Sequence, residues 1–185
     1  MIAVASLLLV LLVVPVSVFL RRAAKARRVQ TLLEKYASDM IREPVIPDGI
    51  DGYIFADYLL RFGNFIITLN IESQKGYVFG APNIDEWTSV VNNRTSKFSN
   101  PLKRAALFAQ QCCHISGFEN VRTHVLFGSD SEFPKGIPEG VVEMTQFEEM
   151  LESLKESEET LEAVEAWSKL KAMDQESRSQ INALI

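Results

Sequence analysis

Cysteine and histidine are scarce in this sequence, which contains two of each among its 185 residues. The two cysteines are adjacent, at Cys112 and Cys113, and neighbouring cysteines form a strained disulfide at best. His114 extends them to a run of three, which lacks the usual spacing of metal ligands, because consecutive helical residues point about 100° apart. A disulfide-based fold and a cysteine–histidine metal site are therefore not expected.

The second histidine, His124, lies in a predicted strand, and no constellation of a serine or cysteine nucleophile accompanies either histidine. A histidine that acts as a general base has to lie within hydrogen-bond reach of the proton it removes. We therefore interpret both histidines as packing or hydrogen-bonding residues rather than as catalytic bases.

A basic excess is also missing from most of the chain, whose formal net charge is −5. Residues 1–43 carry seven Lys and Arg against three Asp and Glu, but residues 44–142 carry eight against ten, and residues 143–185 carry four against eleven. A nucleic-acid-binding domain normally has a basic footprint. The candidates for nucleic-acid contact are therefore one local cluster, which also fits a solvated face: Arg94, Lys97, Lys103 and Arg104.

Charge is absent from residues 2–20, a run of nineteen residues that as a helix spans close to the roughly 30 Å hydrocarbon layer. A cleaved signal peptide is the alternative, but no Lys or Arg precedes the run, and the small-x-small sequence at 24–26 lies inside a basic cluster. We expect an uncleaved single-pass anchor in the inner (cytoplasmic) membrane. The positive-inside rule places the following domain in the cytoplasm, because the flank contains Arg21, Arg22, Lys25, Arg27 and Arg28.

The pattern after the anchor predicts three further parts: a basic juxtamembrane helix over 21–43, an α/β domain over 44–155, and an acidic helical C-terminal tail over 156–185. Within the domain, alternation and β-branched residues predict strands at 52–60, 62–71, 76–80 and 121–127, whereas 83–98 is expected to be a loop with short extended pieces. Asn100 and Pro101 begin a helix that ends near Gly117. The fold class expected is α/β, with a small mixed sheet flanked by helices.

Further helices are predicted at both ends of the domain. Apolar spacing extends the basic helix as far as Ile41, and a Thr145-x-x-Glu148 capping box opens a helix that ends near Leu154. Residues 161–173 repeat an amphipathic pattern, and the residues from 174 onward are expected to fray. An apolar strip that includes Trp167 gives the acidic tail a candidate surface for a protein partner.

Six segments in order are similar to the nuclease-related domain (NERD) family, whose fold resembles that of the restriction endonucleases, the PD-(D/E)XK fold. They are ADYLL, FGNFIIT, KGYVFG, Trp87, FSNPLKRA and VRTHVLFG, and together they cover roughly residues 45 to 155. The resemblance implies the same fold here, and it implies a site built on the strand FGNFIITLNIE.

In that family an Asp at the end of one strand and a Glu in the next strand hold a divalent cation, and a Lys two residues later positions the attacking water. The resemblance places Asp57 at the Asp, Thr68 at the Glu, Asn70 at the Lys and Arg104 at a helical Gln. Threonine supplies no carboxylate to a hard cation, and asparagine carries no charge. The domain is therefore expected to be catalytically degenerate, without a cofactor, and to bind a protein or a nucleic acid near the membrane.

The alternative is an active Mg²⁺-dependent nuclease. Glu72 lies on the same strand face as Thr68, about 13 Å further along an extended strand. A carboxylate displaced along the strand would then share the metal with Asp57. This reading keeps Asp57 and Glu72 as candidate catalytic residues and Asp57 as a metal ligand.

Overall fold

The structure is a computed structural model that describes residues 26–183. The expected anchor over 2–20 lies outside the described residues. The chain divides into two compact units, 1–35 and 36–185, and each is described by itself. The described part of the first unit is helical, and this helix continues to residue 36. No helix within residues 26–183 is both long and apolar enough to cross a membrane.

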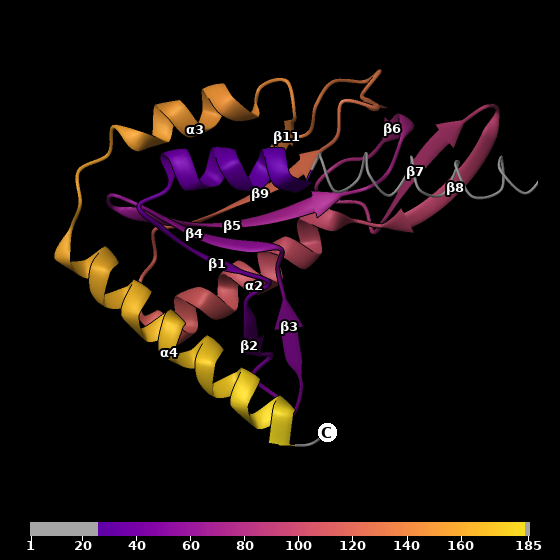
Figure 1. Cartoon of the computed structure of the whole chain (residues 1–185). Helices are drawn as coiled ribbons and strands as arrows, with labels where there is room; N and C mark the ends of the chain where they lie inside the picture. The colour runs from indigo at the N-terminus through magenta and orange to yellow at the C-terminus, as the bar shows by residue number, and fades with distance from the viewer. Residues whose placement is uncertain (1–25, 184–185) are drawn as a thin grey trace, which may run out of the picture. The chain divides into compact units, whose positions relative to one another are not determined.

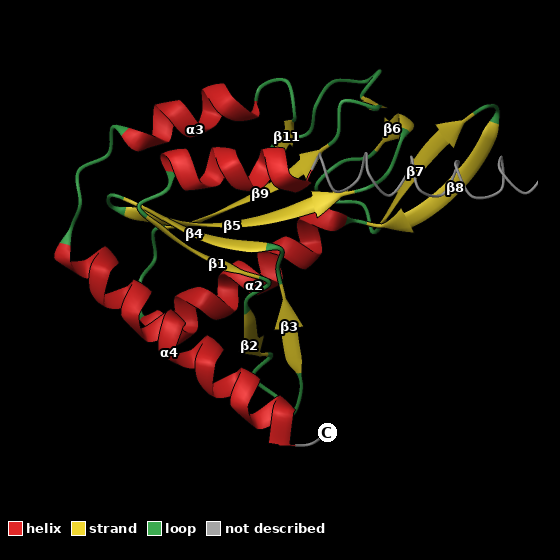
Figure 2. Cartoon of the chain, in the orientation of Figure 1, coloured by secondary structure: helices red, strands yellow, loops and turns green. Residues whose placement is uncertain are grey.

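A mixed five-stranded sheet forms the centre of the second unit, in the order β1-β4-β5-β9-β11 (Figures 1 and 2). β1, β4 and β5 are antiparallel neighbours, whereas β9 runs parallel to both β5 and β11. This confirms the α/β class with a mixed sheet. The strands are β1 (Asp39–Arg42), β4 (Tyr58–Phe62), β5 (Phe65–Glu72), β9 (Val121–Phe127) and β11 (Val141–Glu143).

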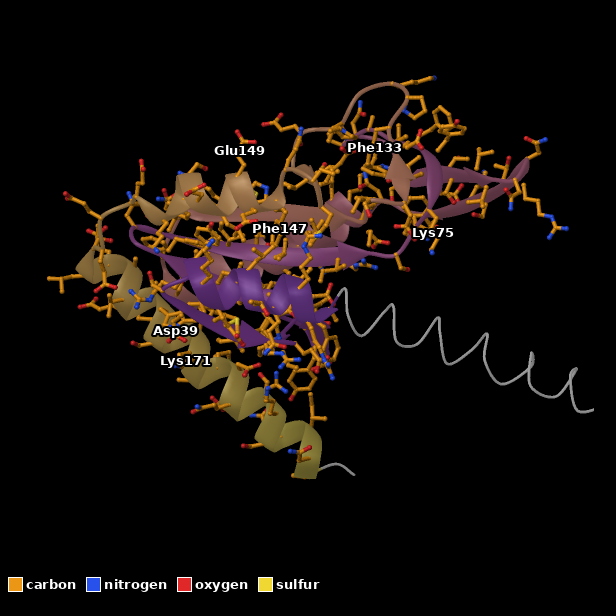
Figure 3. The ribbon with its side chains drawn as sticks, turned by 45° about the horizontal axis from the view of Figure 1, so that its top comes forward. Asp39, Lys75, Phe133, Phe147, Glu149 and Lys171 are labelled. Atoms are coloured by element: carbon orange, nitrogen blue, oxygen red, sulfur yellow. The ribbon has the colours of Figure 1, made fainter. Side chains whose placement is uncertain are left out.

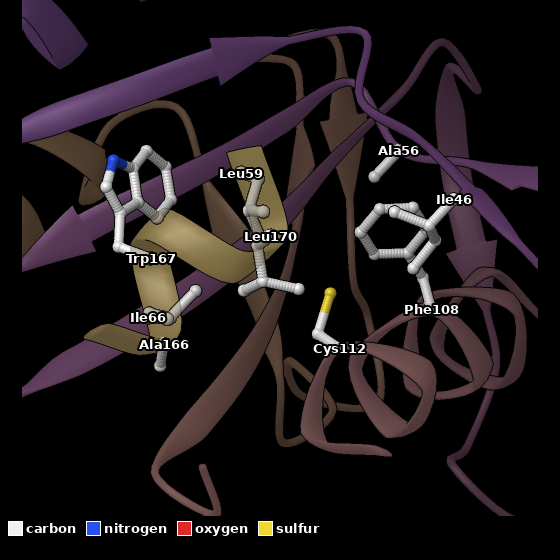
Figure 4. Packing of buried hydrophobic residues seen from close by; sticks show 9 residues of the cluster. All are labelled: Ile46, Ala56, Leu59, Ile66, Phe108, Cys112, Ala166, Trp167 and Leu170. Atoms are coloured by element: carbon white, nitrogen blue, oxygen red, sulfur yellow. The ribbon is translucent and has the colours of Figure 1, made fainter. Parts of the chain in front are cut away.

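Helices flank this sheet. α2 (Pro101–Ser116), which precedes β9 in the chain, packs with α4 (Leu161–Ala183) over one face of the sheet. α3 (Phe147–Lys155) lies on the other side (Figure 1). A buried cluster fills the space beneath α2 and α4 (Figure 4). Its members come from the short strand β2 (Val45–Pro47), from β4, β5 and both helices, and from the segment before β4: Ile46, Ala56, Leu59, Ile66, Phe108, Cys112, Ala166, Trp167 and Leu170.

α2 begins and ends as the sequence predicts. The Asn100 side chain accepts hydrogen bonds from the backbone N–H groups of Leu102 at 2.9 Å and Lys103 at 3.4 Å, and Pro101 occupies the first turn. Gly117 ends the helix with φ of 70°, in the left-handed region that favours glycine. These two caps fix where α2 starts, and therefore which side chains of its first turn face the end of β5.

Residues 83–98, expected to be a loop with short extended pieces, contain two full strands. β7 (Glu86–Val91) and β8 (Arg94–Ser99) form a hairpin that joins β6 (Gly76–Phe79) and β10 (Ser131–Glu132) in a second sheet, in the order β10-β6-β7-β8. Asn92 and Asn93 turn the hairpin with φ of 49° and 59°, a geometry in which asparagine substitutes for glycine. A short third pair consists of β2 (Val45–Pro47) and β3 (Tyr53–Phe55).

Both predicted terminal helices differ from their expected bounds. The N-terminal helix ends at residue 36, because residues 39–42 pair with β4 as strand β1 despite their helical apolar spacing. α3 begins at Phe147, and Gln146 before it makes no side-chain cap, so the expected capping box at Thr145 does not form.

The acidic residues near the C-terminus form α4 and do not fray after 173. The Trp167 indole N–H donates to Asp39 Oδ2 at 2.8 Å, and Lys171 Nζ lies 3.1 Å from the same oxygen (Figure 3). Trp167 and Leu170 are 4% and 0% exposed, so these two residues of the expected apolar strip belong to the core of this unit, whereas Leu161 at the start of α4 is 82% exposed.

Candidate functional site

Asp57 lies directly before β4, beside the end of β5. The β4–β5 register pairs Tyr58 with Leu69, and one further step places Asp57 opposite Asn70. Asp57 Oδ2 accepts a hydrogen bond of 2.6 Å from the backbone N–H of Ile71. The strand pairing therefore brings Asp57 to Asn70, and not to Thr68.

The Asp57 carboxyl is half-buried, and its pKa is raised above the usual aspartate value. Burial is the main cause, because it disfavours the charged form. The hydrogen bond from the Ile71 N–H and the positive charge of Arg104 act in the opposite direction, and the negative charge of Glu43 adds to the rise. A ligand that supplies positive charge or hydrogen-bond donors would therefore stabilise the ionised form of the Asp57 carboxyl.

Asn70 is 4% exposed, and its Oδ1 oxygen has no hydrogen-bond partner among the described residues. A buried amide oxygen without a partner costs free energy of about 1–3 kcal/mol. Such groups are rare, and each calls for an explanation such as strain, an ordered water molecule, or a bound ion or ligand. Asn70 is therefore the residue of β5 that most needs a further partner.

Glu72, at the end of β5, is held by the first turn of α2. The Glu72 carboxylate lies 2.6 Å from the Arg104 guanidinium, and the two side chains are 12% and 59% exposed. The carboxylate that the nuclease alternative requires is thus already paired with a cation. Arg104, the residue at the expected Gln position, supplies that cation.

Thr68 is completely buried in the sheet and is not close to the strand end. Its hydroxyl shares a hydrogen bond of 3.1 Å with the hydroxyl of Thr123 on β9, its direct partner in the parallel register. The three polar side chains on one face of β5, Thr68, Asn70 and Glu72, therefore have three different environments. Thr68 is satisfied by a neighbouring strand, Asn70 lacks a partner for its oxygen, and Glu72 forms an ion pair.

A pocket of about 740 Å³ opens at this end of the sheet. Asp57, Asn70 and Ile71 line it at the strand ends, and α2 and α4 contribute Arg104 and Arg178. Phe55 and Leu107 also line it, and both are unusually exposed for large apolar residues, at 58% and 60%. The remaining lining residues come from β2, β3 and the segments beside them: Glu43, Val45, Tyr53, Ile54 and Ala56.

The residues at this site fit a hard divalent cation poorly. Mg²⁺ prefers several oxygen ligands in octahedral geometry, with carboxylates among them. Asp57 is opposite a neutral amide, and Glu72 is neutralised by Arg104. Within residues 26–183 no group of three His, Cys, Asp or Glu side chains is arranged to hold a metal ion.

The four basic candidates for nucleic-acid contact lie on β8 and in the first turn of α2. Arg94 lies at the tip of the β7–β8 hairpin, and Lys97 forms an ion pair of 3.1 Å with Glu86 along it. Lys103 pairs with Asp85 beside the start of α2, and Arg104 points to Glu72. Three of the four charges are therefore engaged by carboxylates of the same chain.

Two of the pocket residues had no signal in the sequence. Arg178 comes from α4, which the sequence suggested was a separate tail, and Glu43 follows a segment predicted as helix. Glu43 reaches the site because its backbone N–H donates to the Asp57 carbonyl at 2.8 Å. Comparisons of the chain with protein-family models, with curated proteins and with solved structures give no match.

Proposed function

We propose that this protein is a membrane-anchored, cytoplasmic domain of the nuclease-related type that has lost its catalytic set and acts by binding a partner. The observation that carries the proposal is the Asp57–Asn70 pair at the strand end. A two-carboxylate metal site needs an acid at both positions, and here the second position is an amide.

The other polar residues near the family positions are engaged within the chain. Thr68, at the family Glu position, shares a hydrogen bond with Thr123, and Glu72 is paired with Arg104, the residue at the Gln position. Neither residue is free to activate a water molecule in this arrangement.

A protein partner is favoured over a nucleic acid. Residues 44–142 carry a small negative excess, and Lys97, Lys103 and Arg104 are paired within the chain. The exposed side chains of Phe55 and Leu107 beside the pocket give a small apolar contact surface, as interfaces with proteins commonly have.

The full-length protein, incubated with DNA and with RNA in the presence and absence of Mg²⁺ or Mn²⁺, tests the loss of catalysis. No metal-dependent cleavage is expected. Cleavage that depends on the metal and disappears in Asp57→Ala would establish the nuclease alternative instead, with Asp57 and Glu72 as its candidate acidic residues. Cleavage that survives Asp57→Ala points to a contaminating nuclease, and the assay is then repeated on protein purified by an independent route.

The membrane anchor has its own test, since it rests on the apolar run over residues 2–20. The chain is expected to stay with the membrane fraction after alkaline carbonate extraction, and to be released when residues 2–20 are deleted. Protease protection in sealed vesicles then measures on which side the domain lies.

A further inference from the structure

The pocket beside Asp57 contains two arginines, and both are already committed to acceptors of the same chain. Arg104 pairs with Glu72 at 2.6 Å. Arg178 Nε lies 2.9 Å from Asp174, and its terminal nitrogen donates to the carbonyls of Arg42 and Glu43. Arg178 therefore has a structural role in holding α4 against the end of β1.

Three acceptor groups of the pocket remain uncommitted. Asp57 uses one carboxylate oxygen for the Ile71 N–H, and its other oxygen has no hydrogen bond among the described residues. Asn70 Oδ1 is buried without a partner, and the exposed Glu43 carboxylate has no ion pair within residues 26–183. Each arginine is paired with a carboxylate outside the pocket lining, and the two acids that line the pocket, Asp57 and Glu43, form no ion pair within residues 26–183.

The walls above these acceptors are apolar. Val45, Ile54, Ala56 and Leu107 line the pocket together with the exposed ring of Phe55. A ligand that satisfies the site therefore needs donors and positive charge at one end and an aliphatic body behind them. A phosphate fits poorly, because Glu43 and Asp57 repel an anion and both arginines are already paired with carboxylates, and a hydrated metal ion leaves the apolar walls without a contact.

We propose that this pocket binds the side chain of a lysine or arginine of a partner protein. Ammonium and guanidinium groups carry several N–H donors and no acceptor, and they match the uncommitted oxygens of Asp57, Asn70 and Glu43. The aliphatic stem of either side chain packs on apolar surface while the charged head is paired. The inference rests on the proposed binding function of the same site and specifies what the partner presents to it.

The test uses the full-length protein in detergent micelles and Nα-acetyl-arginine amide as the probe. Nα-acetyl-citrulline amide, which has nearly the same shape without the charge, is the matched control ligand. Binding is followed in ¹H–¹⁵N correlation spectra, where the Ile71 amide reports on Asp57 through their hydrogen bond. A single side chain is expected to bind with a Kd of about 1–10 mM, and the citrulline derivative at least tenfold more weakly.

Asp57→Asn removes the charge but keeps an acceptor for the Ile71 N–H, so the variant is expected to fold and to lose at least tenfold in affinity. Glu43→Gln, at an exposed position, is expected to lose several-fold. Asp51→Asn removes an exposed charge from the preceding turn, outside the pocket lining, and is expected to bind as the parent does.

Three outcomes would overturn the inference. They are equal binding of the arginine and citrulline probes, unchanged binding in Asp57→Asn, and shifts at Ile71 caused by Mg²⁺ but not by either arginine or lysine derivatives. If cadaverine binds at least tenfold more tightly than Nα-acetyl-lysine amide, the ligand of the pocket is a free amine and not a side chain of a partner protein. None of these results restores nuclease activity, so they leave the proposed loss of catalysis to its own assay.

Discussion

The guanidinium of Arg104 lies 2.6 Å from the carboxylate of Glu72 and joins the first turn of α2 to the last residue of β5. The carboxylate is largely buried and the guanidinium is largely exposed, at 12% and 59%. A carboxylate with so little contact with water depends on its partner for compensation. The pair therefore differs from an ordinary surface ion pair and belongs to the structure of the strand end.

A double-mutant cycle measures this dependence. Arg104→Ala and Glu72→Gln are each expected to lower stability, with a coupling free energy of about 1 kcal/mol between them, because one side of the pair is desolvated. Urea unfolding gives the four free energies. The exposed pair of Lys75 and Asp130, at 64% and 43%, serves as the comparison. Its coupling is expected to be below about 0.5 kcal/mol, and equal values for the two pairs would contradict the structural role of Glu72.

Asn70→Glu is expected to create a divalent-cation site that the parent protein does not have. The substitution places a second carboxylate opposite Asp57 on the neighbouring strand, and two facing carboxylates suit Mg²⁺ or Mn²⁺. Without metal the variant is expected to be destabilised, because its new acid is buried, and metal should raise its melting temperature.

Calorimetric titration with Mn²⁺ measures the metal binding, and the variant Asp57→Asn/Asn70→Glu is its control. Metal binding that persists after the loss of Asp57 would mean that the two residues do not face each other. Metal binding by the parent protein itself would support the nuclease alternative.

The parts of the fold that the sequence predicts well are specified by neighbouring residues. Asn100, Pro101 and Gly117 determine the ends of α2 through their own backbone geometry. Alternation along 65–72 and 121–127 identifies β5 and β9, the two strands that carry the site. The direct neighbourhood of Asp57 and Asn70 was missed, because strand register is set by the pairing and a shift of two residues leaves the alternation unchanged.

The parts that were predicted wrongly depend on contacts between distant residues. The β7–β8 hairpin is polar and lacks an Asn-Gly turn, and its position follows from the buried Trp87, which stacks with Phe127 of β9. Likewise α4 is rich in charged residues, with four Asp and Glu against three Lys and Arg, so its solvated face dominates its composition. Only its contact with α2 and β2 identifies it as part of the core and thereby brings Arg178 to the pocket.

The stability of the protein is expected to depend on pH through Asp57. Its folded pKa is raised by burial, so the folded state holds this proton more tightly than the unfolded state. Below the ordinary aspartate pKa the group is protonated in both states and has no effect. As pH rises through the folded pKa, the ionised form becomes a modest penalty to folding, which then persists at neutral pH.

Asp57→Asn should therefore raise the melting temperature modestly at pH 7, and the gain should disappear as pH is lowered to about 3. Thermal unfolding followed by circular dichroism between these values measures it. Asp51→Asn, which removes one exposed negative charge, corrects for the change in net charge. If the gain in melting temperature of Asp57→Asn grows as pH falls, the pKa of Asp57 is lowered in the folded state rather than raised.

α4 is expected to be required for folding, because its Trp167 is part of the main core. Trp167→Ala removes a buried indole and is expected to cost about 3–5 kcal/mol. Trp167→Phe, which loses the hydrogen bond to Asp39 at 2.8 Å but keeps most of the apolar contact, should cost about 1–2 kcal/mol. Leu161→Ala, at an 82% exposed position of the same helix, should change stability by less than about 0.5 kcal/mol.

A chain that ends at residue 156 should show no cooperative unfolding transition in urea. If that shortened chain unfolds cooperatively with unchanged stability, the acidic segment is a separate tail, and its apolar strip becomes available to a partner protein.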